Sequence, residues 1–182
     1  FFIYNDAGTQ LGTASITTNI PLASGRELGA GVIATNSGTT ASNGLIGRSR
    51  TFASGQGIQC GTAITGLPSG SGPFSTGVWI RPTTSGKELL GWGLQQGQGK
   101  VVMQYRSPSH VRMDCYFSDG SLDGGGRVLL GEWNHVVHTY RKGESILYVN
   151  GVMDVMNTKG PPLAITNPSK LWIGGWYNRY DF

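Results

Sequence analysis

Charged residues are scarce in this chain: 14 basic and 10 acidic side chains make up 13% of its 182 residues. The basic residues stand singly rather than in runs, a pattern that argues against a dedicated nucleic-acid surface. No stretch reaches ~18 consecutive apolar residues, and no charged and then apolar leader precedes a small-residue cleavage site. We therefore expect no nucleic-acid partner, no membrane insertion and no signal peptide in this sequence.

Cysteine is also rare, since the chain holds only Cys60 and Cys115. The two thiols are compatible with one disulfide and equally with two separate buried cysteines, and their separation matches no metal-ligand spacing. The number of cysteines does not decide the cellular compartment, although it slightly favours an extracellular protein.

Amphipathic helix signals are missing. No window longer than about ten residues places apolar side chains at helical spacing without an interrupting glycine or proline. The 30 glycines, with many Ser, Thr and Asn residues, are instead typical of a fold rich in turns. The composition therefore predicts an all-β sandwich or barrel.

The chain changes character near residue 45. Residues 1–44 hold short apolar patches between long polar intervals, and we interpret them as an N-terminal strand and linker, or as the edge of a preceding module. Residues 45–182 read as one domain of short strands separated by turns at 70–72, 107–110 and 118–126. The expected strands include Thr51–Phe52, Gly77–Arg81, Val101–Arg106, Val111–Phe117 and Val128–Leu130.

Residues 132–151, EWNHVVHTYRKGESILYVNG, gather histidines and aromatic residues. Side chains alternate along a strand, so His135 and His138 point to opposite faces and cannot share a metal ion. A polar turn follows at residues 141–144, and Asn150-Gly151 is suited to a type I′ turn. We interpret this segment as a structural hairpin followed by a second turn.

Several segments resemble the laminin G-like, concanavalin A-like jelly-roll family. The resemblance rests on W-N-H-V-V at 133–137 and L-Y-V-N-G at 147–151, supported by GRSRTF at 47–52, FSTGVWIRP at 74–82 and LWIGGW at 171–176. It implies a two-sheet antiparallel jelly-roll sandwich over roughly residues 45–182. At the family's core positions, the residues expected to pack between the sheets are Trp79, Trp133, Val137, Leu147, Val149 and Trp172.

The resemblance also implies a closing strand that reads like Gly-x-Ile-Asp-Glu-Val-x-Ile. The sequence stops at Asp181-Phe182 before any such segment. Two alternatives follow: the sequence is a shortened fragment, or another part of the chain, such as residues 1–20, supplies the edge strand. An open sheet edge would otherwise pair with a neighbouring molecule.

Catalytic motifs are absent from the sequence. Glycosidases of the broader concanavalin-like fold use two carboxylates about 5 to 5.5 Å apart, usually from a strand reading Glu-x-Asp-x-Glu. No two acidic residues here stand two positions apart, and there is no G-x-S-x-G elbow. We therefore expect a protein that is not an enzyme.

Two segments could bind a sugar through stacking rings and hydrogen-bonding side chains. The first is WGLQQGQGK at 92–100, and the second is WYNRYD at 176–181. The alternative for the first is that Trp92 lies in the core, and for the second that the rings cover the edge of the sandwich. The candidate ligand-binding residues are Trp92, Gln95, Trp176, Tyr177, Asn178 and Arg179.

A third segment, DGSLDGGG at 119–126, carries Asp119 and Asp123. Carboxylates and backbone carbonyls are the ligands that calcium prefers, so calcium is a possible cofactor at these two residues. The segment lacks EF-hand spacing, and a solvated turn is the alternative.

The resemblance implies binding rather than chemistry. The first hypothesis is a non-catalytic module that binds a glycan or cell-surface polysaccharide, or serves adhesion, on an extracellular or surface-displayed protein. The second is a structural module of an extracellular assembly or a viral particle, such as a phage decoration, fibre or tail component, whose partners would be neighbouring subunits.

Overall fold

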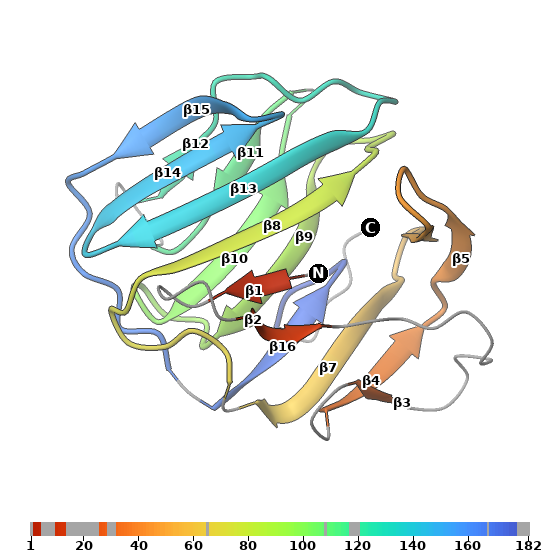
Figure 1. Ribbon diagram of the computed structural model, residues 1–182, viewed down its shortest axis with the longest axis horizontal. Coiled ribbons are helices and arrows are strands. Elements are labelled where there is room, and N and C mark those ends of the chain that lie inside the picture. The colour runs from red at the N-terminus through yellow and green to blue at the C-terminus, as the bar shows by residue number, and fades with distance from the viewer. Residues whose placement is uncertain are drawn as a thin grey trace.

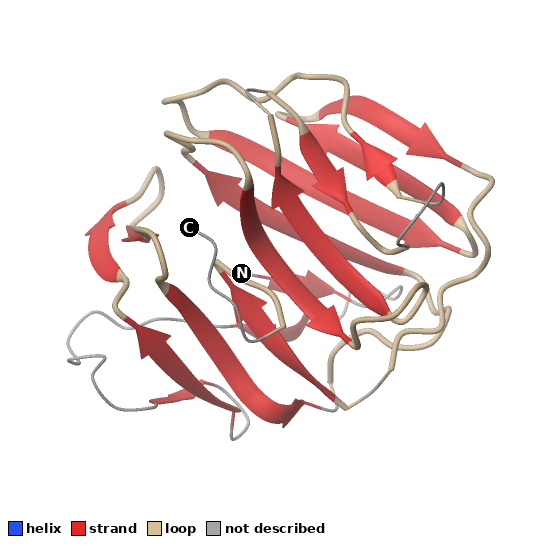
Figure 2. Cartoon of the chain, turned by 180° about the vertical axis from the view of Figure 1, so that it is seen from behind, coloured by secondary structure: helices blue, strands red, loops and turns tan. Residues whose placement is uncertain are grey.

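The computed structural model describes residues 2–4, 10–13, 26–28, 32–64, 66–107, 109–116, 121–166 and 168–177 (Figure 1). Within these ranges the regular structure consists of strands, with no helix. No segment of this part of the chain therefore forms a helix able to cross a membrane. Two antiparallel sheets lie face to face, as both Figure 1 and Figure 2 show, which confirms the predicted jelly-roll sandwich.

The two sheets are built from strands that are far apart in the sequence. The six-stranded sheet has the order β15 (Val152–Asn157), β14 (Glu144–Val149), β13 (Asn134–Arg141), β8 (Phe74–Ile80), β1 (Phe2–Tyr4) and β2 (Gln10–Thr13). The eight-stranded sheet has the order β12 (Leu122–Asp123), β11 (Val111–Met113), β10 (Lys100–Tyr105), β9 (Lys87–Gly93), β16 (Ser169–Ile173), β7 (Gly57–Ile64), β4 (Val32–Ser37) and β3 (Arg26–Leu28). A separate hairpin is formed by β5 (Thr40–Asn43) and β6 (Arg48–Thr51).

Alternation along the strands places one set of side chains between the sheets. In β13 every second residue from Asn134 is buried, and His138 is fully buried while His135 lies on the opposite face. The expectation that these two histidines point apart is therefore confirmed. Leu147 and Val149 of β14 are buried in the main core, as predicted.

The turns of this hairpin region also follow the sequence. Asn150 and Gly151 have φ values of 53° and 78°, so both central residues adopt the left-handed conformation that a type I′ turn requires. Lys142 and Gly143, with φ values of 45° and 84°, form the preceding turn in the same way. Asn150 Oδ1 also accepts a hydrogen bond from the backbone N–H of His135 at 2.8 Å.

The described strands of residues 1–37 are divided between the two sheets. Strands β1 and β2 lie at the edge of the six-stranded sheet beside β8, and β4 pairs with β7 in the other sheet. This agrees with the alternative in which residues 1–20 supply an edge strand. The predicted boundary between residues 44 and 45 falls inside the β5–β6 hairpin, whose two strands pair from Thr40–Thr51 to Asn43–Arg48.

Several strand predictions need correction. Residues 128–130 are not a strand: Val128 is buried in the core, whereas Leu129 and Leu130 are more than half exposed, and the chain turns at Gly131. The predicted strand at 111–117 ends at Met113. Strands β7 and β9 were not predicted, because glycines interrupt their apolar pattern in GIQCGTAI and KELLGWG.

Three tryptophans expected between the sheets lie elsewhere. Trp79 is 44% exposed on the outer face of the six-stranded sheet, because its neighbours Val78 and Ile80 occupy the buried positions of β8. Trp133 is half-buried beneath Arg81, whose Cζ lies 5.9 Å from the indole centroid. Val137, half-buried on β13, also faces outward, and Trp172 is buried but on the outer face of the eight-stranded sheet.

Both cysteines are free and buried, in different hydrophobic clusters. Of the two alternatives, the structure therefore shows two separate thiols. Burial raises the pKa of Cys60 to about 11 and that of Cys115 to about 12, so neither side chain carries the thiolate that nucleophilic or metal-binding chemistry requires.

Candidate functional site

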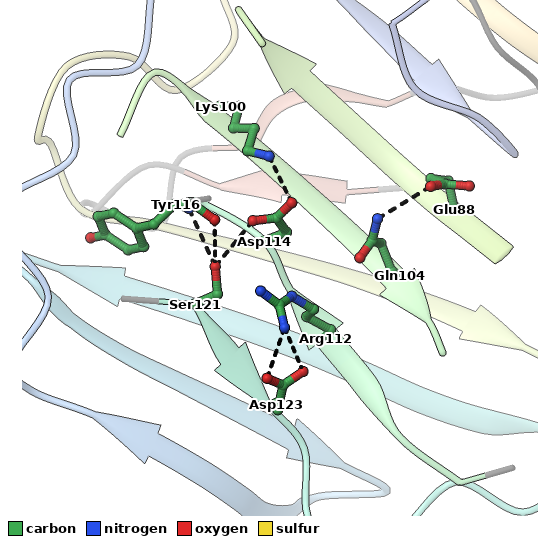
Figure 3. A network of polar contacts seen from close by, with 8 residues as sticks. All are labelled: Glu88, Lys100, Gln104, Arg112, Asp114, Tyr116, Ser121 and Asp123. Carbon is green, nitrogen blue, oxygen red and sulfur yellow. Dashed lines mark hydrogen bonds and ion pairs between the residues drawn. The ribbon is translucent and has the colours of Figure 1, made fainter. Parts of the chain in front are cut away.

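Figure 2 looks onto the outer face of the eight-stranded sheet, the face turned away from the six-stranded sheet. A row of polar side chains crosses four strands of this face. Register places Asp123 of β12 opposite Arg112 of β11, Arg112 opposite Gln104 of β10, and Gln104 opposite Glu88 of β9. We call these four residues the polar row, and Figure 3 shows their side chains lying side by side. Cross-strand neighbours on one face of a sheet are close enough to interact directly.

The polar row is held by two sets of contacts. The guanidinium Nη1 of Arg112 donates to both carboxylate oxygens of Asp123, at 2.8 and 3.1 Å. The amide Nε2 of Gln104 donates to Glu88 Oε1 at 3.2 Å. These contacts fix the orientation of each side chain while leaving the row partly open to solvent, with the Asp123 side chain 63% exposed.

A second network lies at the adjoining end of β10. Lys100 Nζ donates to Asp114 Oδ2 at 2.6 Å, and the Lys100 side chain is almost fully buried. Ser121 Oγ donates to Asp114 Oδ1 at 3.0 Å and contacts the backbone of Tyr116 (Figure 3). The buried ammonium is thus neutralised by one carboxylate, and this pair anchors the segment that follows β11.

An aromatic cluster lies on the same face beside the polar row. Trp172 of β16, Trp176 and Val102 form a buried group separate from the main core. Gly91 lies between Val102 and Trp172 in register, and a Cβ atom there would come within 2.6 Å of Trp176 Cε3. The missing side chain of Gly91 therefore leaves the space that the Trp176 indole occupies.

Tyr177 is the exposed ring of this cluster. Its side chain is 43% exposed, and its ring centroid lies 6.0 Å from that of Trp176 and 6.4 Å from that of Trp172. Its φ of 51° lies in the left-handed region, which is costly for a residue with a β-carbon. Strained backbone of this kind is concentrated at binding and catalytic sites, where it holds a side chain in a required position.

Polar atoms without partners collect on this face. Among the described residues, the buried atoms Gln104 Oε1, Arg112 Nε, Trp172 Nε1 and Trp176 Nε1 make no hydrogen bond. A buried polar atom left unpaired costs about 1 to 3 kcal/mol, so such groups are uncommon in stable cores. These four atoms lie on the same face as the exposed ring of Tyr177.

The sequence-predicted binding residues are thus only partly brought together. Trp92 lies inside the sandwich, 1% exposed, because β9 continues through Gly93 and turns this side chain toward the core. That position confirms the core alternative for Trp92 and removes it from the binding candidates. Gln95 is exposed on the following loop, and Asn178 and Arg179 lie outside the described residues.

In the second predicted segment, residues 176–181, the two described rings differ in exposure. Trp176 is 5% exposed and serves as a buried support, whereas the adjacent Tyr177 presents its ring to solvent. The polar row was missed by sequence reasoning, because Glu88, Gln104 and Arg112 come from three separate strands. Their alternation with buried apolar residues was the available signal, but register alone shows that they are neighbours.

The calcium expectation rests on Asp119 and Asp123. Asp119 lies outside the described residues, and the Asp123 carboxylate accepts two hydrogen bonds from Arg112, whose positive charge occupies the place of a cation. In the described ranges no three His, Cys, Asp or Glu residues converge as a metal site would require. Calcium binding at Asp119 and Asp123 stays a prediction.

The face combines a stacking ring with fixed amide, carboxylate and guanidinium groups. An aromatic ring packs against the apolar side of a saccharide, while the polar groups exchange hydrogen bonds with its hydroxyls. Of the three carboxylates on this face, Asp114 and Asp123 are each paired with a cation, and Glu88 accepts a hydrogen bond from Gln104.

Comparison with known proteins places these observations in a family. A laminin G-type family model, described as the concanavalin A-like lectin/glucanases superfamily, matches residues 52–182. No curated protein sequence matches the chain.

Solved structures share the fold at low sequence identity. Domain 4 of an extracellular arabinanase from Geobacillus stearothermophilus, solved with arabinotriose, is 17% identical with a TM-score of 0.60, over 83% of this chain and 77% of that one. The binding domain of botulinum neurotoxin serotype G is 9% identical with a TM-score of 0.58, over 80% of this chain and 42% of that one. The LG4-5 domains of the mouse laminin alpha1 chain are 16% identical with a TM-score of 0.50, over 62% and 31%. The chain thus spans less than half of the neurotoxin and laminin structures.

Proposed function

Because the chain belongs to the concanavalin A-like lectin/glucanases superfamily, we propose that it is a non-catalytic carbohydrate-binding or adhesion module of an extracellular or surface-displayed protein. Its glycan binds on the outer face of the eight-stranded sheet, across Tyr177 and the polar row. The observation that carries this proposal is Tyr177, an exposed ring held in a strained conformation beside fixed polar side chains.

The comparisons support a saccharide as the ligand. The arabinanase domain of similar fold was solved with arabinotriose, which is an oligosaccharide. Support for a role without catalysis comes from the carboxylates of this face: Asp114 is paired with Lys100, Asp123 is paired with Arg112, and Glu88 accepts a hydrogen bond from Gln104. A retaining or inverting glycosidase needs two carboxyl groups free to exchange protons or attack the sugar.

Replacing Tyr177 tests the proposed site directly. We first screen the folded protein on a broad glycan array, with calcium and again with a chelator, and then measure the strongest ligand by isothermal titration calorimetry. Tyr177→Ala removes the stacking ring, and we expect a loss of about tenfold or more in affinity. The melting temperature is expected to change little, because the ring is 43% exposed.

Two glycine variants provide a matched pair for this experiment. Gly91→Ala places a methyl group against the Trp176 indole, which must then move together with Tyr177, so glycan affinity should fall. Gly66→Ala adds the same methyl group where no atom lies within 4 Å, and affinity should be retained. Unchanged binding by both Tyr177→Ala and Gly91→Ala would move the site away from this face.

The assembly hypothesis is favoured by one observation. Edge strand β15 exposes Val152, Met153 and Met156, each at about half of its surface, and a sheet edge with apolar side chains can pair with another chain. If the module acts alone as a binding domain, light scattering should give the mass of a monomer, 19.4 kDa, up to high micromolar concentration. A stable larger species lost in Met153→Lys would instead support assembly through β15.

A further inference from the structure

The outer face of the six-stranded sheet, which Figure 1 looks onto, carries a second aromatic surface. Register pairs Trp79 of β8 with His135 of β13, and their rings are stacked with centroids 4.7 Å apart at an angle of 18°. Arg81 directly follows β8 and Trp133 directly precedes β13, and there the Arg81 guanidinium lies over the Trp133 ring. We call Trp79, Arg81, Trp133 and His135 the indole surface.

Gly77 makes room for this arrangement. A Cβ atom at Gly77 would lie 3.6 Å from His135 Nε2 and 3.3 Å from Val137 Cγ2. The imidazole of His135 therefore extends over the glycine, where it lies flat against one side of Trp79. A glycine inside a strand commonly marks such a close approach, and here it leaves a shelf on which an exposed indole is held rigid.

The exposure of Trp79 is not explained by the fold. The ring is 44% exposed in the middle of a sheet whose other face already forms the main core. An exposed apolar surface of this kind marks a contact with another molecule. Because Trp79 is backed by His135, it would lose little conformational freedom when a ligand stacks on it.

The charges of the indole surface indicate what that ligand carries. The four residues of the indole surface include the guanidinium of Arg81 and the imidazole of His135, and none of the four carries a carboxylate. The next row of the same face, Gly77, Val137, Tyr148 and Met153, is uncharged. Arg81 is exposed, and a guanidinium presents paired donors that match a carboxylate.

We propose that the indole surface is a second saccharide site, selective for sugars that carry a carboxylate. The sugar ring stacks on Trp79, and its carboxylate accepts hydrogen bonds from Arg81. This site lies on the opposite side of the sandwich from Tyr177. Variants of Trp79 and Arg81 therefore test it independently of the site proposed above. With both sites occupied, one module would bridge two chains of a polysaccharide.

Binding of uronic and sialic acid sugars tests this proposal. The probes are oligogalacturonate, oligomannuronate and sialyllactose, followed by tryptophan fluorescence and calorimetry, with the methyl ester of oligogalacturonate as the uncharged match. We expect at least one acidic probe to bind, and Trp79→Ala and Arg81→Gln each to weaken it by about tenfold or more. Ile46→Ser, at the exposed tip of the β5–β6 hairpin, is the control and should bind as the parent does.

Each contrary result overturns the second site. It is wrong if the folded protein binds none of the three probes, or if both variants bind with unchanged affinity. Equal affinity for the oligogalacturonate and its methyl ester removes the role of the carboxylate. Loss of acidic-sugar binding in Tyr177→Ala, with Trp79→Ala unaffected, assigns the ligand to the eight-stranded sheet instead. Thermal melting of each variant tests whether Trp79→Ala and Arg81→Gln remain folded, which is the expected result.

Discussion

Trp92→Ala is expected to lower the free energy of unfolding by about 3 to 5 kcal/mol, the usual cost of deleting a large buried aromatic side chain. Trp92 is 1% exposed and packs edge-on against Phe74, with ring centroids 5.5 Å apart. Its indole Nε1 donates to the carbonyl oxygen of Pro68 at 3.0 Å. The substitution removes ring contacts on all sides and leaves that carbonyl without this partner. Equilibrium unfolding in urea measures the effect.

Two further variants divide this cost into its causes. Trp92→Phe keeps a ring but removes the donor to Pro68, so it should fall between the parent and Trp92→Ala. Trp79→Ala deletes the same side chain from the outer face, where the main loss is the stack on His135, worth about 1 kcal/mol. Equal destabilisation by Trp92→Ala and Trp79→Ala would contradict the burial of Trp92 between the sheets.

This pair of tryptophans also shows what the sequence could predict. Strand alternation places residues on two faces, but it does not say which face is buried. In β8, FSTGVWI, Trp79 alternates with Gly77 and Ser75, and this pattern assigns it to the solvent side even though indoles are usually buried. Trp79 was expected between the sheets and is instead 44% exposed, whereas for Trp92 the core alternative was the correct one of the two.

Local features were predicted more successfully than long-range ones. The type I′ turn at Asn150-Gly151 depends on two residues that tolerate positive φ, and it was confirmed. The polar row depends on the register of four strands between Glu88 and Asp123, which no single segment encodes. In the same way, Gly91 of β9 makes room for Trp176, which follows β16 and lies beside Tyr177. Such contacts follow from the fold as a whole.

The position of His138 predicts a loss of stability in acid. Its side chain is fully buried on β13, with its ring 5.5 Å from that of Phe74 and Nε2 3.3 Å from Ser145 Oγ. Burial lowers the pKa of His138 from 6.5 to about 3, since the apolar surroundings oppose a charged imidazole. The folded protein therefore keeps this histidine neutral through the whole range from pH 7 to pH 4.

The sign of the effect follows from proton binding. Between pH 6.5 and about pH 3 the unfolded chain binds a proton at His138 and the folded chain does not, so acid favours unfolding. Each pH unit in this window removes up to ~1.4 kcal/mol of stability, or roughly 4 to 5 kcal/mol over the window. Stability is fully present above pH 6.5 and is lost progressively as the pH falls toward 3.

Urea unfolding of the parent and His138→Leu at pH 7, 6, 5 and 4 isolates this contribution. Other groups titrate in the same range, so the measured quantity is the difference between the two proteins at each pH. We expect His138→Leu to lose about 3 kcal/mol less than the parent between pH 7 and pH 4, whatever its stability at pH 7. Leu147→Val changes the residue opposite His138 without altering a titrating group, and it should keep the parent's dependence on pH. Parallel curves for the parent and His138→Leu would show that His138 becomes protonated in the folded protein, and hence that water reaches the imidazole between the sheets.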